Sequence, residues 1–114
     1  MRVGLDIDGT ISAAPVLFAG IARSLIAQGH EVWIITGAGE LSARVEQMGA
    51  LGVPWTRLAV VDNGNPPHIL GPIKARYCRA HSIDVMVDDF PEVVDACLAD
   101  GTPAVLFTPP GGFS

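Results

Sequence analysis

Val3-Gly4-Leu5-Asp6-Ile7-Asp8-Gly9-Thr10 is the stretch from which the rest of the chain can be interpreted. A short apolar run ends there in two carboxylates that are two positions apart. Positions i and i+2 of a strand point to the same side, so a bend at Gly9 would let Asp6 and Asp8 face one point beyond the edge of a sheet. Two like charges this close need a cation, a shared proton or a reactive role. The segment therefore predicts a metal-dependent active site at the end of a strand.

The composition is that of one globular domain, which we expect to span residues 1–114. The chain is 49 % hydrophobic and 17 % charged, which excludes a disordered protein. Its net charge is −5 and its basic side chains form no cluster beyond Arg76 and Arg79, so neither nucleic acid nor a membrane is an expected partner. The longest apolar runs have the length of strands, and the N-terminus shows no secretory pattern. These features predict a cytoplasmic protein in which Cys78 and Cys97 are reduced and pack as small apolar side chains.

Strand patterns and helix patterns alternate along the chain. We expect strands at 2–7, 31–36, 58–61, 83–87 and 104–107, where apolar and β-branched residues form short runs. We expect helices at 15–28, 39–49, 72–80 and 91–100, with Pro72 in the first turn of one and a Glu40–Arg44 pair on the exposed side of another. Residues 62–71 predict a loop, and 108–114 predict a frayed tail. This alternation predicts the α/β class, with a three-layer, doubly wound, Rossmann-like parallel sheet of about five strands.

Polar side chains gather where the expected strands end, which is where ligands bind in such sheets. The strand-end residues are Asp6, Asp8, Thr36, Asp62, Asn63, Asp88 and Asp89. Crowded carboxylates suit Mg²⁺, which keeps several waters and leaves room for a phosphate of a substrate. Thr36 and the backbone N–H groups of Gly37 and Ala38 form a natural anion site before a helix. Lys74, the only lysine, would reach over the acidic residues from the first turn of its helix.

Four motifs in this order resemble those of the haloacid dehalogenase superfamily of aspartyl-nucleophile phosphatases. Asp6-Ile7-Asp8-Gly9-Thr10 resembles its first motif, Ile34-Ile35-Thr36 the second, Lys74 the third and Val87-Asp88-Asp89 the fourth. The third motif is weak as a pattern and depends on position. The resemblance spans Asp6 to Asp89, and the expected strand at 104–107 fits the fold of that superfamily as well.

The resemblance implies a Mg²⁺-dependent phosphomonoester hydrolase that acts through an aspartyl-phosphate. Asp6 would attack phosphorus, and Asp8 would protonate the leaving group and then activate water. Thr36, Gly37 and Lys74 would hold the phosphoryl group. The implied metal ligands are Asp6, the backbone carbonyl of Asp8, Asp88 and, through water, Asp89. Dehalogenases of the superfamily lack the second acid of the first motif, so Asp8 favours phosphoryl chemistry.

The chain is too short for the cap domain that larger members of this superfamily insert. Only 26 positions separate Thr10 from Thr36, and an expected helix and strand occupy most of them. We therefore expect an open site, closed by the turn at 12–15, by the loop at 62–71 or by a second subunit acting as a lid. The expected partner is a small phosphorylated substrate, or an accessible phosphate of a larger molecule.

Several of these residues also have simpler interpretations. Asn63 and Asn65 are expected turn formers, and His68 is expected to be a loop residue. Asp88 and Asp89 would cap the helix that begins at Pro91.

Three other functions stay open. The first is a receiver-like signalling domain, which also combines acids, Thr and Lys but in a different chain order. The second is a binding or scaffold module with a catalytically idle site. The third is phosphotransfer to an acceptor other than water.

Overall fold

The molecule is built around a parallel sheet of five strands in the order β3-β2-β1-β4-β5. The computed structural model describes residues 1–109. The strands are β1 (Arg2–Leu5), β2 (Glu31–Thr36), β3 (Arg57–Val60), β4 (Val85–Asp88) and β5 (Ala104–Leu106). A helical turn, η1 (Ile7–Ile11), follows β1. The expectation of a doubly wound parallel α/β sheet is therefore confirmed.

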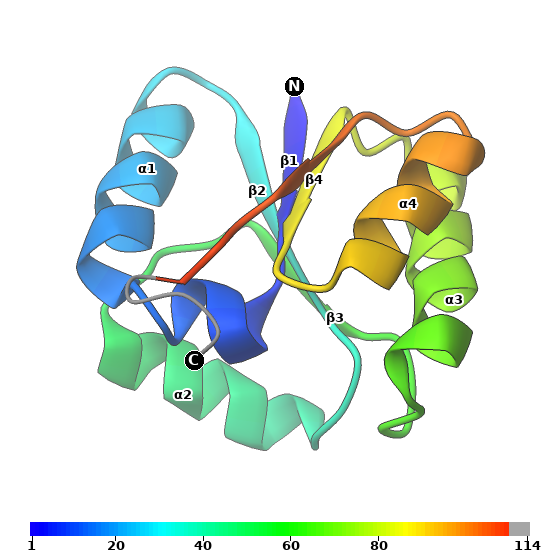
Figure 1. Ribbon diagram of the computed structural model, residues 1–114. Helices are drawn as coiled ribbons and strands as arrows, with labels where there is room; N and C mark the ends of the chain where they lie inside the picture. The colour runs from blue at the N-terminus through cyan, green and yellow to red at the C-terminus, as the bar shows by residue number, and fades with distance from the viewer. Residues whose placement is uncertain (110–114) are drawn as a thin grey trace.

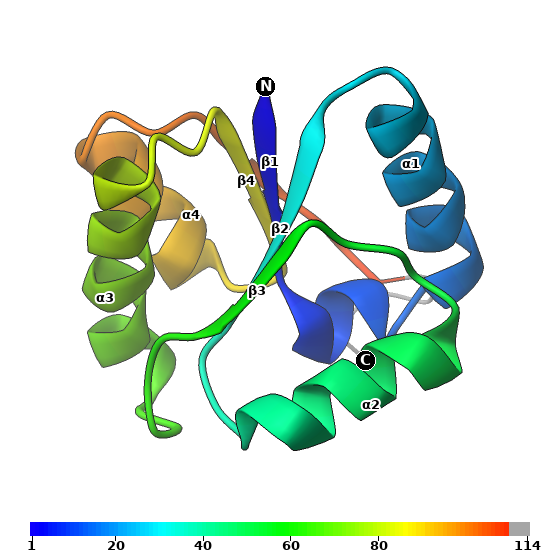
Figure 2. The same cartoon turned by 180° about the vertical axis from the view of Figure 1, so that it is seen from behind.

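Helices cover both faces of this sheet and complete the three layers. They are α1 (Pro15–Ala27), α2 (Leu41–Leu51), α3 (Pro67–Ala80) and α4 (Pro91–Ala99). Figures 1 and 2 show α1 and α2 on one face, and α3 and α4 on the other. No inserted cap domain interrupts residues 1–109, as expected from the short spacing of the motifs.

Each face of the sheet has its own apolar core. Leu5, Val32 and Ile34 face α1 and α2, where Phe18 and Met48 pack against them. The opposite core contains Trp33, Ile35, Met86, Cys78 and Cys97, together with apolar residues of α3 and α4. Successive residues of a strand point to opposite faces, so β2 serves both cores and is buried from its second residue on. Cys78 and Cys97 are buried and free, as the sequence predicts.

The sheet changes direction between β1 and β4. From β1 the chain moves outward through β2 to β3, and it then returns across the sheet to place β4 on the other side of β1. The crevice beyond the carboxyl ends of such neighbouring strands is where open α/β sheets bind ligands. A receiver-type sheet has the order 2-1-3-4-5 instead, so the receiver interpretation is wrong for this chain.

The largest departure from the expected elements is the start of α3. Residues 67–71 are helical, so the expected loop at 62–71 ends at Pro66 and the helix at 72–80 is longer than expected. The two adjacent prolines suggest a break, but Pro67 occupies the first helical turn, where its fixed φ suits a helix and its missing N–H costs nothing. Pro72 lies in the interior, and Lys74 lies well past the first turn rather than in it.

The other boundaries agree with the expected ones to within two residues. The strand expected at 2–7 ends at Leu5, because the chain turns into η1 earlier than the apolar pattern indicates. The helix expected at 39–49 is shifted to Leu41–Leu51, and the strand expected at 83–87 begins at Val85. Of the expected tail, residues 110–114 lie outside the described residues. Among the described helices, none has the length and hydropathy required to cross a membrane.

Candidate functional site

A tight turn directly after β1 begins the site. Asp8 has φ −68° and ψ 122°, and Gly9 has φ 77° and ψ −6°, which are the angles of the central residues of a type II turn. The positive φ favours glycine, and a Cβ atom at this position would collide with the carboxylate of Asp89. Gly9 therefore allows the end of β1 to pass close to the end of β4.

Three buried carboxylates meet at this point. Asp6, Asp88 and Asp89 are each at most 5 % exposed, and one oxygen of each lies within 4.8 Å of the others. The backbone N–H of Asp6 donates to the carbonyl of Val87 over 3.1 Å, which continues the pairing of β1 with β4 up to the site. The expectation that the acidic residues after β1 and at the end of β4 are neighbours is confirmed.

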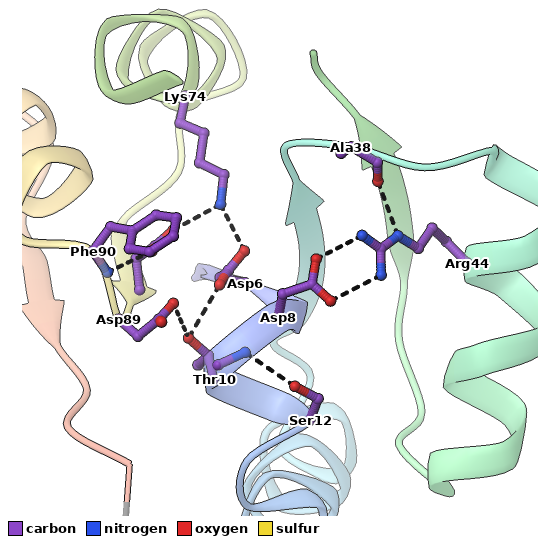
Figure 3. A network of polar contacts seen from close by, with 11 residues as sticks. Asp6, Asp8, Thr10, Ser12, Ala38, Arg44, Lys74, Asp89 and Phe90 are labelled. Carbon is purple, nitrogen blue, oxygen red and sulfur yellow. Dashed lines mark hydrogen bonds and ion pairs between the residues drawn. The ribbon is translucent and has the colours of Figure 1, made fainter. Parts of the chain in front are cut away.

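Lys74 enters the carboxylate cluster from α3 (Figure 3). Its Nζ donates over 2.7 Å to Asp6 and over 2.7 Å to Asp88, and the side chain is 1 % exposed. The hydroxyl of Thr10 lies 3.2 Å from both Asp6 and Asp89, so its single proton is available to either carboxylate. The expectation that Lys74 reaches the acidic cluster is confirmed, although it does so from deeper in α3.

Burial outweighs the ion pairs in setting the protonation of these acids. Burial raises the pKa of Asp6 from 3.8 to about 6, although Lys74 opposes the change, and the neighbouring Asp89 adds to it. Burial likewise raises the pKa of Asp88 above its ordinary value, again against the influence of Lys74. The pKa of Lys74 is raised, because the charges of Asp6 and Asp88 outweigh the effect of its burial. One ammonium thus leaves three carboxylates incompletely neutralised.

This deficit of positive charge fits a divalent cation. The donors are hard carboxylate oxygens from three residues, which is the ligand type that Mg²⁺ prefers. Asp6, Asp88 and Asp89 are the residues that would hold the ion. The carboxylate of Asp8 is not part of this triad.

Thr36 carries the one buried side-chain polar atom without a hydrogen-bond partner in the described part of the chain. It ends β2, is 0 % exposed, and its hydroxyl oxygen meets no donor or acceptor. A buried hydroxyl without a partner costs about 1–3 kcal/mol, so it calls for an explanation such as a functional role, an ordered water or a bound ligand. Its position at the carboxyl edge of the sheet next to Gly37 suits an anion.

A small pocket of about 150 Å³ opens over these residues. Its lining combines two acidic residues, the backbone after β2, the loop after β3, and two apolar side chains: Asp6, Asp8, Gly37, Ala38, Gly64, Asn65, Leu70 and Phe90. Lys74 and Thr36 are not lining residues, but Lys74 contacts Asp6 and Thr36 directly precedes Gly37. The pocket therefore makes Asp6 accessible to a ligand, whereas the side chains of Lys74 and Thr36 are buried next to the lining residues.

The loop after β3 forms one wall of this pocket. Asp62 accepts hydrogen bonds from the backbone and side-chain amides of Asn65, over 2.9 and 2.8 Å. The backbone N–H of Gly64 donates to the carbonyl of Gly37 over 3.1 Å. Asn65 is thus a turn former, as expected, and also a lining residue. His68 is exposed in the first turn of α3 rather than in a loop.

Asp8 differs most from its expected position. Its side chain is 64 % exposed and is paired with Arg44 of α2 rather than directed at the carboxylate triad (Figure 3). The oxygens of Asp8 accept from the two terminal nitrogens of Arg44 over 3.1 and 2.6 Å. The expected Glu40–Arg44 pair is therefore wrong. Arg44 is the residue of the site that the sequence reasoning missed, because helical spacing offers Glu40 as a nearer partner.

Asp88 and Asp89, which precede α4, do not cap this helix. Phe90 is the residue that precedes the helix, and no side chain caps its N-terminus. Asp88 accepts from the backbone N–H of Phe90 over 3.0 Å, while its other oxygen faces Lys74. The capping expectation for Asp88 and Asp89 is therefore wrong, and both carboxylates belong to the triad.

Comparisons with known proteins support the fold alone. No protein-family model matches the chain, and no curated protein matches it. Among solved structures it resembles a crystal structure of an uncharacterised protein from Corynebacterium glutamicum, with 14 % sequence identity and a TM-score of 0.68. The match covers 94 % of this chain and 84 % of that one.

Proposed function

We propose that this protein is a Mg²⁺-dependent phosphomonoester hydrolase in which Asp6 is the nucleophile. The observation that carries the proposal is the buried triad of Asp6, Asp88 and Asp89, joined by Lys74 at the switch point of the sheet. The unpartnered hydroxyl of Thr36 is an independent sign of a missing oxyanion at the same edge. The resemblance of the four motifs to haloacid dehalogenase phosphatases agrees with both.

Asp6 is suited to attack phosphorus because one of its oxygens can be held while the other reacts. Lys74 holds one oxygen over 2.7 Å, and the other lies 3.2 Å from the hydroxyl of Thr10. Attack would form a bond between an Asp6 oxygen and phosphorus, and the bond to the leaving oxygen would break. Water would then release the phosphate and regenerate Asp6.

The charge of the phosphoryl group would be met by groups already in place. The hydroxyl of Thr36 could donate to one phosphoryl oxygen, and Gly37 and Ala38, which follow it in the chain, line the pocket. Mg²⁺ held by Asp6, Asp88 and Asp89 would supply Lewis acidity and neutralise phosphoryl charge. Asp8 stands at the rim, where it can protonate a leaving oxygen once its side chain leaves Arg44.

The experiment that tests this function measures phosphate release from p-nitrophenyl phosphate and from a panel of phosphorylated metabolites. We expect turnover with Mg²⁺ and loss of turnover with a chelator. Asp6→Asn removes the nucleophile with almost no change of shape and should abolish turnover. Asp95→Asn makes the same chemical change on an exposed residue of α4 and serves as the control.

The alternatives give different results in the same experiment. Turnover by Asp6→Asn at the rate of the unmodified protein would overturn the proposed nucleophile. Mg²⁺ binding without turnover of any substrate would favour the idle binding module. Transfer of phosphate to an added alcohol in preference to water would favour the phosphotransferase.

A further inference from the structure

Arg44 is a rigid cation at the rim of the pocket. Its Nε donates to the carbonyl of Ala38 over 2.9 Å, and one terminal nitrogen donates to Gln47 over 2.8 Å. The side chain is only 13 % exposed, although it carries a full charge. A guanidinium that is anchored on this many sides keeps its orientation when one of its partners leaves.

The backbone beside Arg44 leaves room for the guanidinium. Gly39 has φ +100°, which other residues rarely adopt, and a Cβ atom there would lie 2.6 Å from Nε of Arg44. Ala38, whose carbonyl binds the same Nε, also lines the pocket. The segment between β2 and α2 thus holds the guanidinium next to the pocket.

Asp8 is the exposed partner of this pair. Its carboxylate is 64 % exposed, so its side chain can leave Arg44 for water or for the pocket without disturbing any core. The pairing is bidentate, with one oxygen of Asp8 for each terminal nitrogen of Arg44, and a planar guanidinium matches a carboxylate in this way. The contact with Asp8 therefore shows that Arg44 is oriented to bind a carboxylate.

We propose that Arg44 determines specificity by binding a carboxylate on the leaving group of the substrate in place of Asp8. This inference depends on the proposed phosphatase function. The exchange has a consequence for the reaction, because a carboxylate bound by Arg44 displaces Asp8 and so favours its turn toward the leaving oxygen. The substrate class is accordingly a phosphorylated carboxylic acid. A phosphomonoester without a carboxylate does not displace Asp8 in this way, so it should be turned over more slowly.

The test compares matched phosphonates by isothermal titration with the Mg²⁺-loaded protein. Phosphonoacetate, 3-phosphonopropionate and 4-phosphonobutyrate are paired with methyl-, ethyl- and propylphosphonate, so each pair differs by one carboxylate. We expect the carboxylate to tighten binding about tenfold for at least one chain length. We call the gain in affinity within a pair the carboxylate ratio. Arg44→Gln should bring this ratio to about one, and Arg44→Lys should restore part of it. Asp8→Asn removes the competing carboxylate and should increase the ratio.

The controls separate this inference from the proposed function. Arg23→Gln makes the same charge change on an exposed part of α1 and should leave the ratio as it is. A ratio near one at every chain length, with Asp6-dependent turnover of p-nitrophenyl phosphate intact, would overturn the role of Arg44 and leave the phosphatase standing. A ratio that survives Arg44→Gln would overturn it as well. If p-nitrophenyl phosphate is not turned over and no phosphonate binds, both proposals fail.

Discussion

The ammonium nitrogen of Lys74 lies 2.7 Å from a carboxylate oxygen of Asp6, although 68 positions separate the two residues in the chain. The same nitrogen reaches Asp88, so a single buried cation connects α3 with the ends of β1 and β4. These are the strands between which the sheet changes direction. The ion pairs therefore hold together the part of the fold that forms the site.

Lys74→Met should destabilise the metal-free protein strongly. Removing one member of a buried ion pair costs about 3–5 kcal/mol, because the remaining charges stay buried without a partner. Chemical denaturation in a chelator would measure the loss in the free energy of unfolding. Adding Mg²⁺ should reduce the loss, since the metal compensates the same carboxylates.

Arg76→Met is the matched control for Lys74→Met, because Arg76 is exposed on the same helix. Its effect should stay within about 0.5 kcal/mol. Equal losses for the two variants would contradict the role given to Lys74.

Mg²⁺ should raise the melting temperature through the carboxylate triad. A ligand present at ten times its Kd stabilises the folded state by about 1.4 kcal/mol, which corresponds to a shift of several degrees for a domain of this size. Asp89→Asn removes one member of the triad without breaking the contacts of Lys74, and should largely abolish the shift. Differential scanning calorimetry with Mg²⁺ and with chelator would measure it. Asp95→Asn should respond as the unmodified protein does, and a full shift in Asp89→Asn would contradict the assignment.

The stability of the metal-free protein should fall as the pH rises from about 4 to about 6 because of Asp6. The unfolded chain releases the proton of this acid near its ordinary pKa of 3.8, whereas the folded protein keeps it up to about 6. The folded state therefore binds more protons across this range, and stability decreases until both states are ionised. The groups that face Asp6 are Lys74, Asp88, Asp89 and Thr10.

Asp6→Asn cannot titrate, so its stability should depend less on pH than that of the unmodified protein over this interval. Denaturation in a chelator at several pH values would measure both curves. Parallel curves for the two proteins would contradict the raised pKa.

Gly9→Ala should weaken both the fold and Mg²⁺ binding. The left-handed conformation costs an alanine about 1–2 kcal/mol, and its methyl group would displace the carboxylate of Asp89. Gly20→Ala is the control, since a Cβ atom there meets nothing within 4 Å on the exposed side of α1, and it should stabilise the protein by about 0.5–1 kcal/mol. Thermal melts with and without Mg²⁺ would compare the two. A Gly9→Ala protein with unchanged Mg²⁺ affinity would show that the turn does not position Asp89.

The fold was predictable because the hydrophobic periodicity of each segment agrees, in most of the chain, with the residues that typically begin and end helices and strands. The strand at Glu31–Thr36 is apolar and bounded by polar residues, and it was found to the residue. The start of α3 was missed because Pro66 and Pro67 suit a loop and a first helical turn equally well, and only packing decides between them. The side chain of Leu70 in this turn packs against the backbone of Gly37.

The same limit applies to the site. The clustering of Asp6, Thr36 and Asp88 was predictable, because the carboxyl ends of parallel strands lie at the same edge of a sheet regardless of side-chain packing. The pairing of Asp8 with Arg44 was not predictable, because it depends on where α2 lies over the sheet and on the space that Gly39 leaves. Helical spacing offers candidate pairs such as Glu40–Arg44, but only the tertiary structure decides whether a pair between elements replaces them.

Thr36→Val should make the empty protein more stable and make it bind phosphate more weakly. The hydroxyl of Thr36 is buried without a partner, so replacing it with a methyl group of similar size removes a desolvation cost of about 1–3 kcal/mol. Thr56→Val should have the opposite effect on stability, because its hydroxyl accepts a hydrogen bond from the backbone of Val32 over 3.0 Å and its loss costs about 1 kcal/mol. Denaturation curves and titration with inorganic phosphate in the presence of Mg²⁺ would measure both properties. A Thr36→Val protein that is less stable, or that binds phosphate as tightly as before, would show that this hydroxyl serves the fold rather than a ligand. The opposite signs expected for the two threonines arise because the hydroxyl of Thr56 is satisfied within the protein, whereas that of Thr36 has no partner among the described residues.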